Sequence, residues 1–115
     1  MKTNSNPILD QSLDFSLEII DFCEILDNGK KYVLSRQLLK SGTSIGANVY
    51  EAQSPESKAD FIHKMKIADK ETRETEYWLT LCQRSRFYPN CEPLISKLME
   101  IQKILSSIIG SSRKG

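Results

Sequence analysis

The sequence predicts an all-α protein, an antiparallel up-down-up-down bundle of four helices. Apolar residues recur every three or four positions through four segments of the 115-residue chain, and no segment shows sustained two-residue alternation. The prolines at positions 7, 55, 89 and 93 leave long stretches that suit helices, because proline is poorly tolerated inside a helix. The connections between these stretches are short, so successive helices are expected to pack antiparallel in a single domain over residues 1–115.

The first two helices are predicted at about residues 8–27 and 30–53. Asp27-Asn28-Gly29 is expected to end the first helix, because glycine and asparagine accept the left-handed conformation. Gly42 and Gly46 lie four residues apart in the second, where missing side chains let another helix approach closely. A break in that helix near residues 41–43 is the competing interpretation. The predicted apolar faces consist of Phe15, Ile19, Phe22 and Leu26, and of Leu34, Leu38, Gly42, Ile45, Val49 and Ala52.

The third helix, predicted at about residues 57–86, is the longest, and at 1.5 Å per residue it would span about 45 Å. Ser57 and Asp60 resemble a capping box at its start. The fourth helix is predicted at about residues 92–109, and residues 111–115 are expected to form a frayed tail. The predicted apolar faces consist of Phe61, Met65, Ala68, Thr72, Thr75, Leu79 and Cys82, and of Leu94, Leu98, Ile101, Leu105 and Ile108.

The residue inventory argues against an enzyme, a metal site or a bound cofactor. Cys23, Cys82 and Cys91 form no C-x-x-C pair, and His63 is the only histidine. The sequence around these cysteines and this histidine shows no motif that pairs a catalytic nucleophile with a general base. No apolar run approaches the roughly 18 residues of a membrane span, and no signal-peptide core follows Lys2. The expectation is a cytoplasmic, non-enzymatic domain with no membrane association and no cofactor.

The formal net charge of +1 hides an uneven distribution. Residues 7–29 contain six acidic residues and no lysine or arginine, so the rest of the chain carries the basic excess. A basic stripe on the third helix begins at His63 and follows helical spacing, as phosphate-binding side chains would. The alternative is a solvated face, because Asp69 can pair with Arg73 and Lys70 with Glu74. The candidate nucleic-acid contacts are Arg36, Lys40, Lys66, Lys70 and Arg73.

A polar stripe runs beside the apolar face of the second helix and consists of Gln37, Ser41, Ser44 and Asn48, continued by Glu51. Thr72 and Thr75 occupy core positions of the third helix, with Glu71 and Glu74 alongside. Since buried polar groups must be hydrogen-bonded, this pattern predicts a network between the two helices. The alternative is a solvated helix flank. Trp78, beside the apolar face, is expected to pack in the bundle or at a subunit contact.

Residues 37–48, QLLKSGTSIGAN, resemble the hallmark of the four-helix proteins known from 23S rRNA intervening sequences, as do Glu51-Ala52 and residues 57–61, 66–68 and 71–79. The resemblance covers about residues 12–109. It implies a left-handed antiparallel bundle that assembles as a ring, a homopentamer. Similar proteins include the accessory variability determinant of diversity-generating retroelements, which binds nucleic acid and a reverse transcriptase. The resemblance also implies structural or interface roles for Gln37, Ser44, Asn48, Glu51 and Glu71.

The leading functional hypothesis is an oligomeric bundle that binds RNA, DNA or a protein that handles them, such as a reverse transcriptase. The alternative is a structural protein-protein interaction module without nucleic-acid binding. A third hypothesis is a small hydrolase or nuclease that uses Asp60, Glu71 or Glu74 with a metal ion. Self-association is expected because some apolar residues lie outside the main faces. These residues are Leu17, Ile25, Ile95, Ile104 and Ile109.

Overall fold

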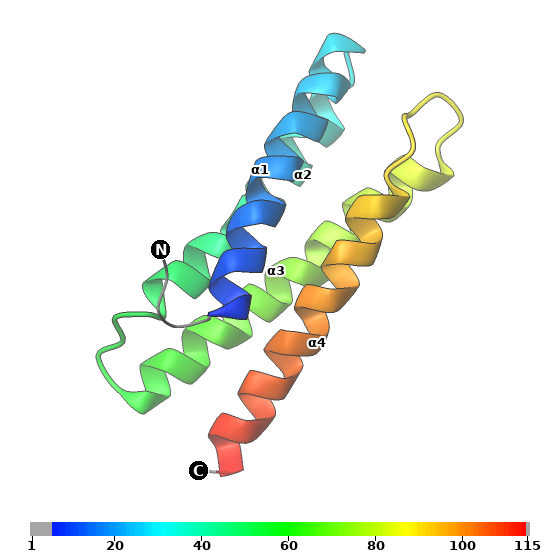
Figure 1. Ribbon diagram of the computed structural model, residues 1–115. Helices are drawn as coiled ribbons and strands as arrows, with labels where there is room; N and C mark the ends of the chain where they lie inside the picture. Colours follow the sequence, from blue (N-terminus) through cyan, green and yellow to red (C-terminus); the bar gives the residue numbers. More distant parts are fainter. Residues whose placement is uncertain (1–5, 115) are drawn as a thin grey trace.

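The computed structural model describes residues 6–114, which form four helices and, over that range, no strand. The helices are α1 (Pro7–Asn28), α2 (Tyr32–Glu51), α3 (Lys58–Arg84) and α4 (Glu92–Lys114). Figure 1 shows two helical hairpins side by side, in which the chain reverses direction at each connection. Each helix packs against two others. Within residues 6–114, α1 does not pack against α3, and α2 does not pack against α4. The predicted all-α bundle is confirmed.

The helix ends follow local capping chemistry, with one departure from expectation. The Asn6 side chain accepts a hydrogen bond from the Leu9 N–H, and the Ser57 hydroxyl accepts one from the Asp60 N–H at 3.0 Å. After α1 the left-handed residue is Lys30, with φ of 63°, whereas Gly29 has φ of −86°. The first helix therefore ends within Asp27-Asn28-Gly29 as predicted, but the left-handed residue is Lys30 rather than the glycine or the asparagine.

Two predicted features of the helices are also corrected. Helix α2 continues without interruption through Gly42, so the proposed break near residues 41–43 does not occur. Helix α4 continues to Lys114 rather than ending near residue 109, so residues 111–114 of the predicted tail are helical, and Gly115 of that tail lies outside the described residues. Ile108 and Ile109 pack against the core, which holds the last turns of α4 in place.

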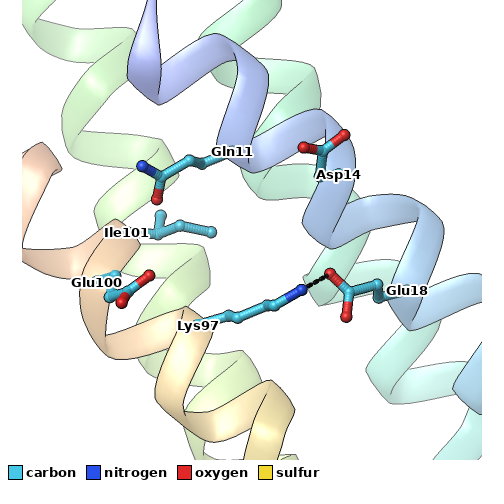
Figure 2. A pocket seen from close by; sticks show the side chains of 6 residues that line it. All are labelled: Gln11, Asp14, Glu18, Lys97, Glu100 and Ile101. Carbon is cyan, nitrogen blue, oxygen red and sulfur yellow. Dashed lines mark hydrogen bonds and ion pairs between the residues drawn. The ribbon is translucent and has the colours of Figure 1, made fainter.

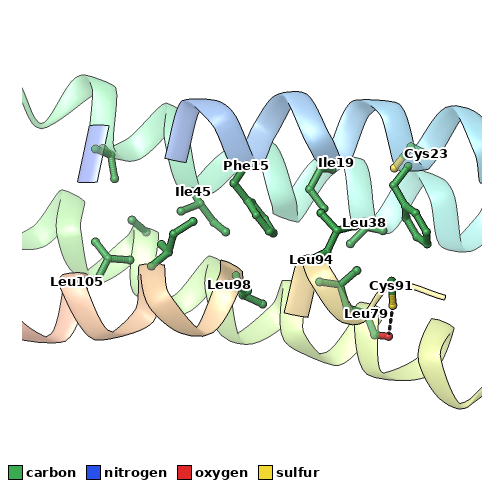
Figure 3. Packing of buried hydrophobic residues seen from close by; sticks show 14 of the residues in the cluster. Phe15, Ile19, Cys23, Leu38, Ile45, Leu79, Cys91, Leu94, Leu98 and Leu105 are labelled. Carbon is green, nitrogen blue, oxygen red and sulfur yellow. Dashed lines mark hydrogen bonds between the residues drawn. The ribbon is translucent and has the colours of Figure 1, made fainter. Parts of the chain in front are cut away.

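The predicted apolar faces meet in one core along the bundle axis, shown in Figure 3. Every residue of those faces is buried except Leu34, Phe61 and Ile108, which are half-buried against the core. The close approach of α1 and α2 depends on Gly42, because a Cβ atom there would lie 2.9 Å from both Cγ1 and Cγ2 of Ile19. The small residue on α2 therefore sets the distance between the first two helices.

The three cysteines are free thiols in the core. The Cys23 Sγ–H donates to the Ser35 carbonyl at 3.4 Å, and the Cys91 Sγ–H donates to the Leu79 carbonyl at 3.2 Å. Burial raises the pKa of Cys82 to about 12, and nearby Cys91 and Cys23 add to the rise. The three cysteine side chains therefore fill the core as small apolar groups.

None of the helices in the described part of the chain has an apolar stretch long enough to span a bilayer.

Candidate functional site

The polar stripe of α2 makes one buried hydrogen bond to α3 among the described residues. The Ser41 and Thr75 hydroxyl oxygens are 3.0 Å apart, and both side chains are fully buried. The Thr75 hydroxyl is also 2.8 Å from the Glu71 carbonyl oxygen. Ser44 and Asn48 instead donate to carbonyl groups one turn earlier in α2, at 2.7 and 2.9 Å. The stripe is thus anchored to α3 at a single buried pair.

The remaining residues of the stripe lie nearer to solvent. Gln37 is exposed, and Glu51 is exposed with its carboxylate 2.8 Å from the Lys64 ammonium of α3. The Trp78 indole donates to the Glu74 carboxylate at 3.2 Å and meets the Tyr77 ring edge to face, with centroids 5.0 Å apart. Trp78 therefore lies half-buried on the flank of α3 rather than inside the core.

Glu71 is the most perturbed carboxyl group at the α2–α3 seam. Partial burial raises the pKa of Glu71, and the neighbouring Glu74 carboxylate adds to the rise. The positive charges of Lys40 on α2 and of Lys70 act against this rise in the pKa of Glu71. Across residues 6–114, no three His, Cys, Asp or Glu side chains converge in a group that could hold a metal ion.

Replacing Thr75 with valine is expected to lower the free energy of unfolding by about 1–3 kcal/mol, because the buried Ser41 hydroxyl loses its partner on α3. Urea unfolding of the purified protein measures the difference. Thr80→Val is the matched control, since Thr80 is half-buried on the same helix and makes no side-chain hydrogen bond within residues 6–114. Equal losses in the two variants would contradict a stabilising role for the Ser41–Thr75 pair.

The predicted basic stripe lies on the outer surface of α3. Lys66, Lys70 and Arg73 are all exposed. Arg73 forms the expected contact with Asp69, but at 4.0 Å, whereas the expected Lys70–Glu74 pair is not formed. In the described part of the chain neither Lys66 nor Lys70 makes an ion pair, so both ammonium groups face solvent.

A fourth cation, which sequence reasoning missed, lies beside the stripe. Arg73 and Lys103 line the same shallow groove between α3 and α4, together with Gln102. The Gln102 amide donates to the Glu76 carboxylate of α3 at 3.1 Å and holds the two helices in this register. Because Lys103 belongs to a different helix, no spacing along the sequence relates it to Arg73.

The two candidate cations of α2 are less closely associated with the stripe. Arg36 and Lys40 are both exposed, and the positive charge of Lys40 lowers the pKa of Glu71 on α3. The carboxylates of Glu71 and Glu74 lie on that flank of α3. The structure therefore groups Lys66, Lys70 and Arg73 with Lys103, and leaves Arg36 and Lys40 on another helix.

The apolar residues outside the main faces divide into two sets. Leu17 and Ile25 of α1 are 60% and 54% exposed. Ile95, Ile104 and Ile109 of α4 are half-buried against the core, so their contribution to an external apolar surface was overestimated.

Comparisons with known proteins agree with this architecture. A family model described as 23S rRNA-intervening sequence protein matches residues 4–107. The chain is also similar to a crystal structure from Bacteroides thetaiotaomicron, described as a protein with unknown function from the S23 ribosomal protein family. The two sequences are 46% identical, the match covers 89% of this chain and 97% of that chain, and the TM-score is 0.84. No curated protein matches. The chain belongs to the 23S rRNA-intervening sequence protein family.

Proposed function

We propose that this protein is a non-catalytic, oligomeric four-helix bundle that binds RNA or DNA through the basic surface of α3. The observation that carries the proposal is the exposed stripe of Lys66, Lys70 and Arg73, extended across the α3–α4 groove by Lys103. Side chains of this type bind phosphate oxygens without reading base sequence. The proposal concerns attachment to a nucleic-acid backbone, not recognition of a particular sequence.

The spacing of the stripe suits a nucleic-acid strand. Lys66 and Arg73 are separated by about 10 Å along α3, at 1.5 Å per residue. One strand of a DNA duplex advances about 3.4 Å per phosphate, so three cations in this distance match roughly three phosphates. A single stripe of this size predicts weak, salt-sensitive binding. Several copies in one assembly would raise the affinity by multivalency.

Self-association is proposed through an apolar surface of the α1–α2 hairpin. Two contacts align α2 with α1: the Ser35 hydroxyl donates to the Cys23 carbonyl, and Gly42 packs on Ile19. Leu39 lies between Ser35 and Gly42 on the same face of α2, so it lies beside the segment of α1 from Ile19 to Cys23. Contiguous exposed apolar surface of this kind is typical of subunit contacts. Each residue of this surface is between 40% and 60% exposed, and the surface consists of Leu13, Leu17, Ile20 and Leu39. The family resemblance favours a homopentameric ring.

Charge reversal on α3 tests the nucleic-acid proposal. Lys66→Glu, Lys70→Glu and Arg73→Glu in one variant are expected to weaken low-salt binding to labelled RNA and DNA by more than about tenfold, because three attractions become repulsions. Fluorescence anisotropy measures the affinity.

The control variant combines Lys30→Glu, Lys58→Glu and Arg113→Glu, three exposed cations outside the stripe that give the same net charge. Equal losses in both triple variants would contradict the assignment to α3. Failure of the unmodified protein to bind RNA or DNA would favour a protein-protein interaction module, the second candidate, which the net charge of +1 supports.

The oligomer is tested by light scattering. The unmodified protein is expected to show a multiple of its 13.1 kDa chain mass, with five copies as the expected number. Leu17→Asp with Ile20→Asp is expected to yield a monomer, because two carboxylates would be buried at the contact. Val33→Asp, at an exposed apolar position of α2, is the control and should leave the assembly intact. A monomeric mass for the unmodified protein would contradict self-association.

A further inference from the structure

Two adjoining pockets between α1 and α4 form a surface groove that shares no residue with the α3 basic stripe. One part is lined by Asp14, Glu18, Lys97 and Glu100, shown in Figure 2. A second part, which shares Glu18, continues past Asp21, Phe22, Ile25, Pro93 and Leu94. The residues of α1 that line it, from Gln11 to Ile25, extend over about 21 Å at 1.5 Å per residue. The two parts together match the length of about four helical turns, and the Lys97–Glu18 ion pair crosses the groove where they meet.

The groove combines an apolar floor with an acidic rim. Phe22 and Leu94 lie at the bottom of its second part and are each 7% exposed, so the exposed apolar surface there comes mainly from Ile25, which is 54% exposed. Helices α1 and α4 are the least closely packed neighbours in the bundle, which leaves Ile25 at the edge of the groove open to solvent. A partner could bury apolar side chains at this position without displacing any helix of the bundle.

The charge of the rim is strongly one-sided. Asp14, Asp21 and Glu100 make no ion pair within residues 6–114. Lys97 is the one cation among the residues that line the two parts, and Figure 2 shows it reaching from α4 to pair with Glu18. The groove therefore repels phosphate groups and attracts cations.

We propose that the α1–α4 groove binds a basic amphipathic helix of a partner protein. Apolar side chains of that helix would pack on Phe22, Ile25 and Leu94, while its lysine or arginine side chains would pair with Asp14 and Asp21. This is the helix-in-groove mode of recognition, in which the apolar face provides affinity and flanking charges provide orientation. The inference does not depend on nucleic-acid binding by α3.

The chain's own basic stripe fits the groove less well. Helix α3 exposes Lys66, Lys70 and Arg73, whereas the apolar residues between them in the sequence, Ile67 and Ala68, are half-buried and buried. A second copy docked by this stripe would satisfy the acidic rim and leave the apolar floor uncovered. The combination of rim and floor therefore favours a separate amphipathic helix.

The test uses a labelled synthetic peptide with leucine on one helical face and lysine on its flanks. Fluorescence anisotropy with the full chain is expected to show binding of this peptide, and no binding of a peptide with glutamate in place of lysine. A scrambled peptide of the same composition should bind at least about tenfold more weakly, because its apolar residues no longer share one face.

Variants locate the peptide on the protein. Asp14→Lys with Asp21→Lys is expected to weaken peptide binding by more than about tenfold, and Ile25→Asp should weaken it similarly. The control is Glu24→Lys with Asp27→Lys, which makes the same charge change at two exposed positions of α1 that do not line the groove. This control should bind the peptide almost as well as the unmodified protein.

Three outcomes would overturn the inference. These are no binding of the basic peptide, equal loss in the two double variants, or dissociation of the oligomer by Asp14→Lys with Asp21→Lys. The last would assign the groove to a second copy. The Lys66→Glu, Lys70→Glu and Arg73→Glu variant should retain peptide binding, which separates failure of this inference from failure of the nucleic-acid proposal.

Discussion

Replacing Phe15 with alanine is expected to lower the free energy of unfolding by about 3–5 kcal/mol. The ring is 1% exposed and lies in the middle of the core, among side chains from other helices (Figure 3). Its removal forfeits buried apolar surface and leaves a cavity that rigid helices cannot fully close.

Chemical denaturation at one fixed protein concentration measures the loss, because stability depends on concentration in an oligomer. Ile25→Ala is the control on the same helix, and its side chain is 54% exposed. That variant is expected to stay within about 0.5 kcal/mol of the unmodified protein. A smaller loss for Phe15→Ala than for Ile25→Ala would contradict the described core.

Replacing Gly42 with leucine is expected to cost about 3 kcal/mol, because the side chain overpacks the contact between α1 and α2. Its Cβ atom would lie 2.9 Å from two branches of Ile19, which is itself fully buried and has no space to move into. The leucine would gain about 1 kcal/mol of helix propensity over glycine, which does not offset the clash.

Gly110→Leu is the matched control for this substitution. Gly110 lies in α4, is exposed, and a Cβ atom there meets nothing within 4 Å. The same change at this position is expected to be neutral or to stabilise by up to about 1 kcal/mol. Thermal or urea unfolding of both variants checks the pair. An unchanged stability for Gly42→Leu would show that the helices do not require this close approach.

The helices and their buried faces could be predicted because burial follows a local periodic signal. Phe15, Leu38, Leu79 and Leu98 all lie where a 3.6-residue repeat places them. Helix ends carry a weaker signal. The residues after Ile109 include glycine and serine, which are poor helix formers, yet packing of that isoleucine against the core carries α4 onward.

The contacts between helices could not be predicted from the sequence. The Ser41–Thr75 hydrogen bond, the Glu51–Lys64 ion pair and the neighbouring positions of Arg73 and Lys103 depend on how far each helix is rotated about its axis. Periodicity fixes which residues share a face of one helix, but not which residue of the next helix lies opposite.

The polar stripe shows why a buried-network prediction overreached. A serine or asparagine within a helix can donate to the carbonyl one turn earlier, and this satisfies it without any partner helix. Ser44 and Asn48 both do so. The stripe joins the two helices in the core where the Thr75 hydroxyl lies opposite Ser41, and at the surface where Lys64 pairs with Glu51.

The near-neutral total charge combines two surfaces of opposite sign. The acidic α1–α4 groove and the basic surface of α3 lie on different parts of the bundle, and each suits a different partner. A basic peptide and a nucleic-acid strand could therefore bind to one molecule without competing for the same side chains.

The salt dependence of RNA and DNA binding tests the role of α3 most directly. A plot of log K against log salt concentration is expected to lose about one unit of slope for each of Lys66→Gln, Lys70→Gln and Arg73→Gln, because each removes one phosphate contact. Lys58→Gln, outside the stripe, should leave the slope unchanged. Slopes that are equal in all four variants and the unmodified protein would contradict nucleic-acid binding through α3.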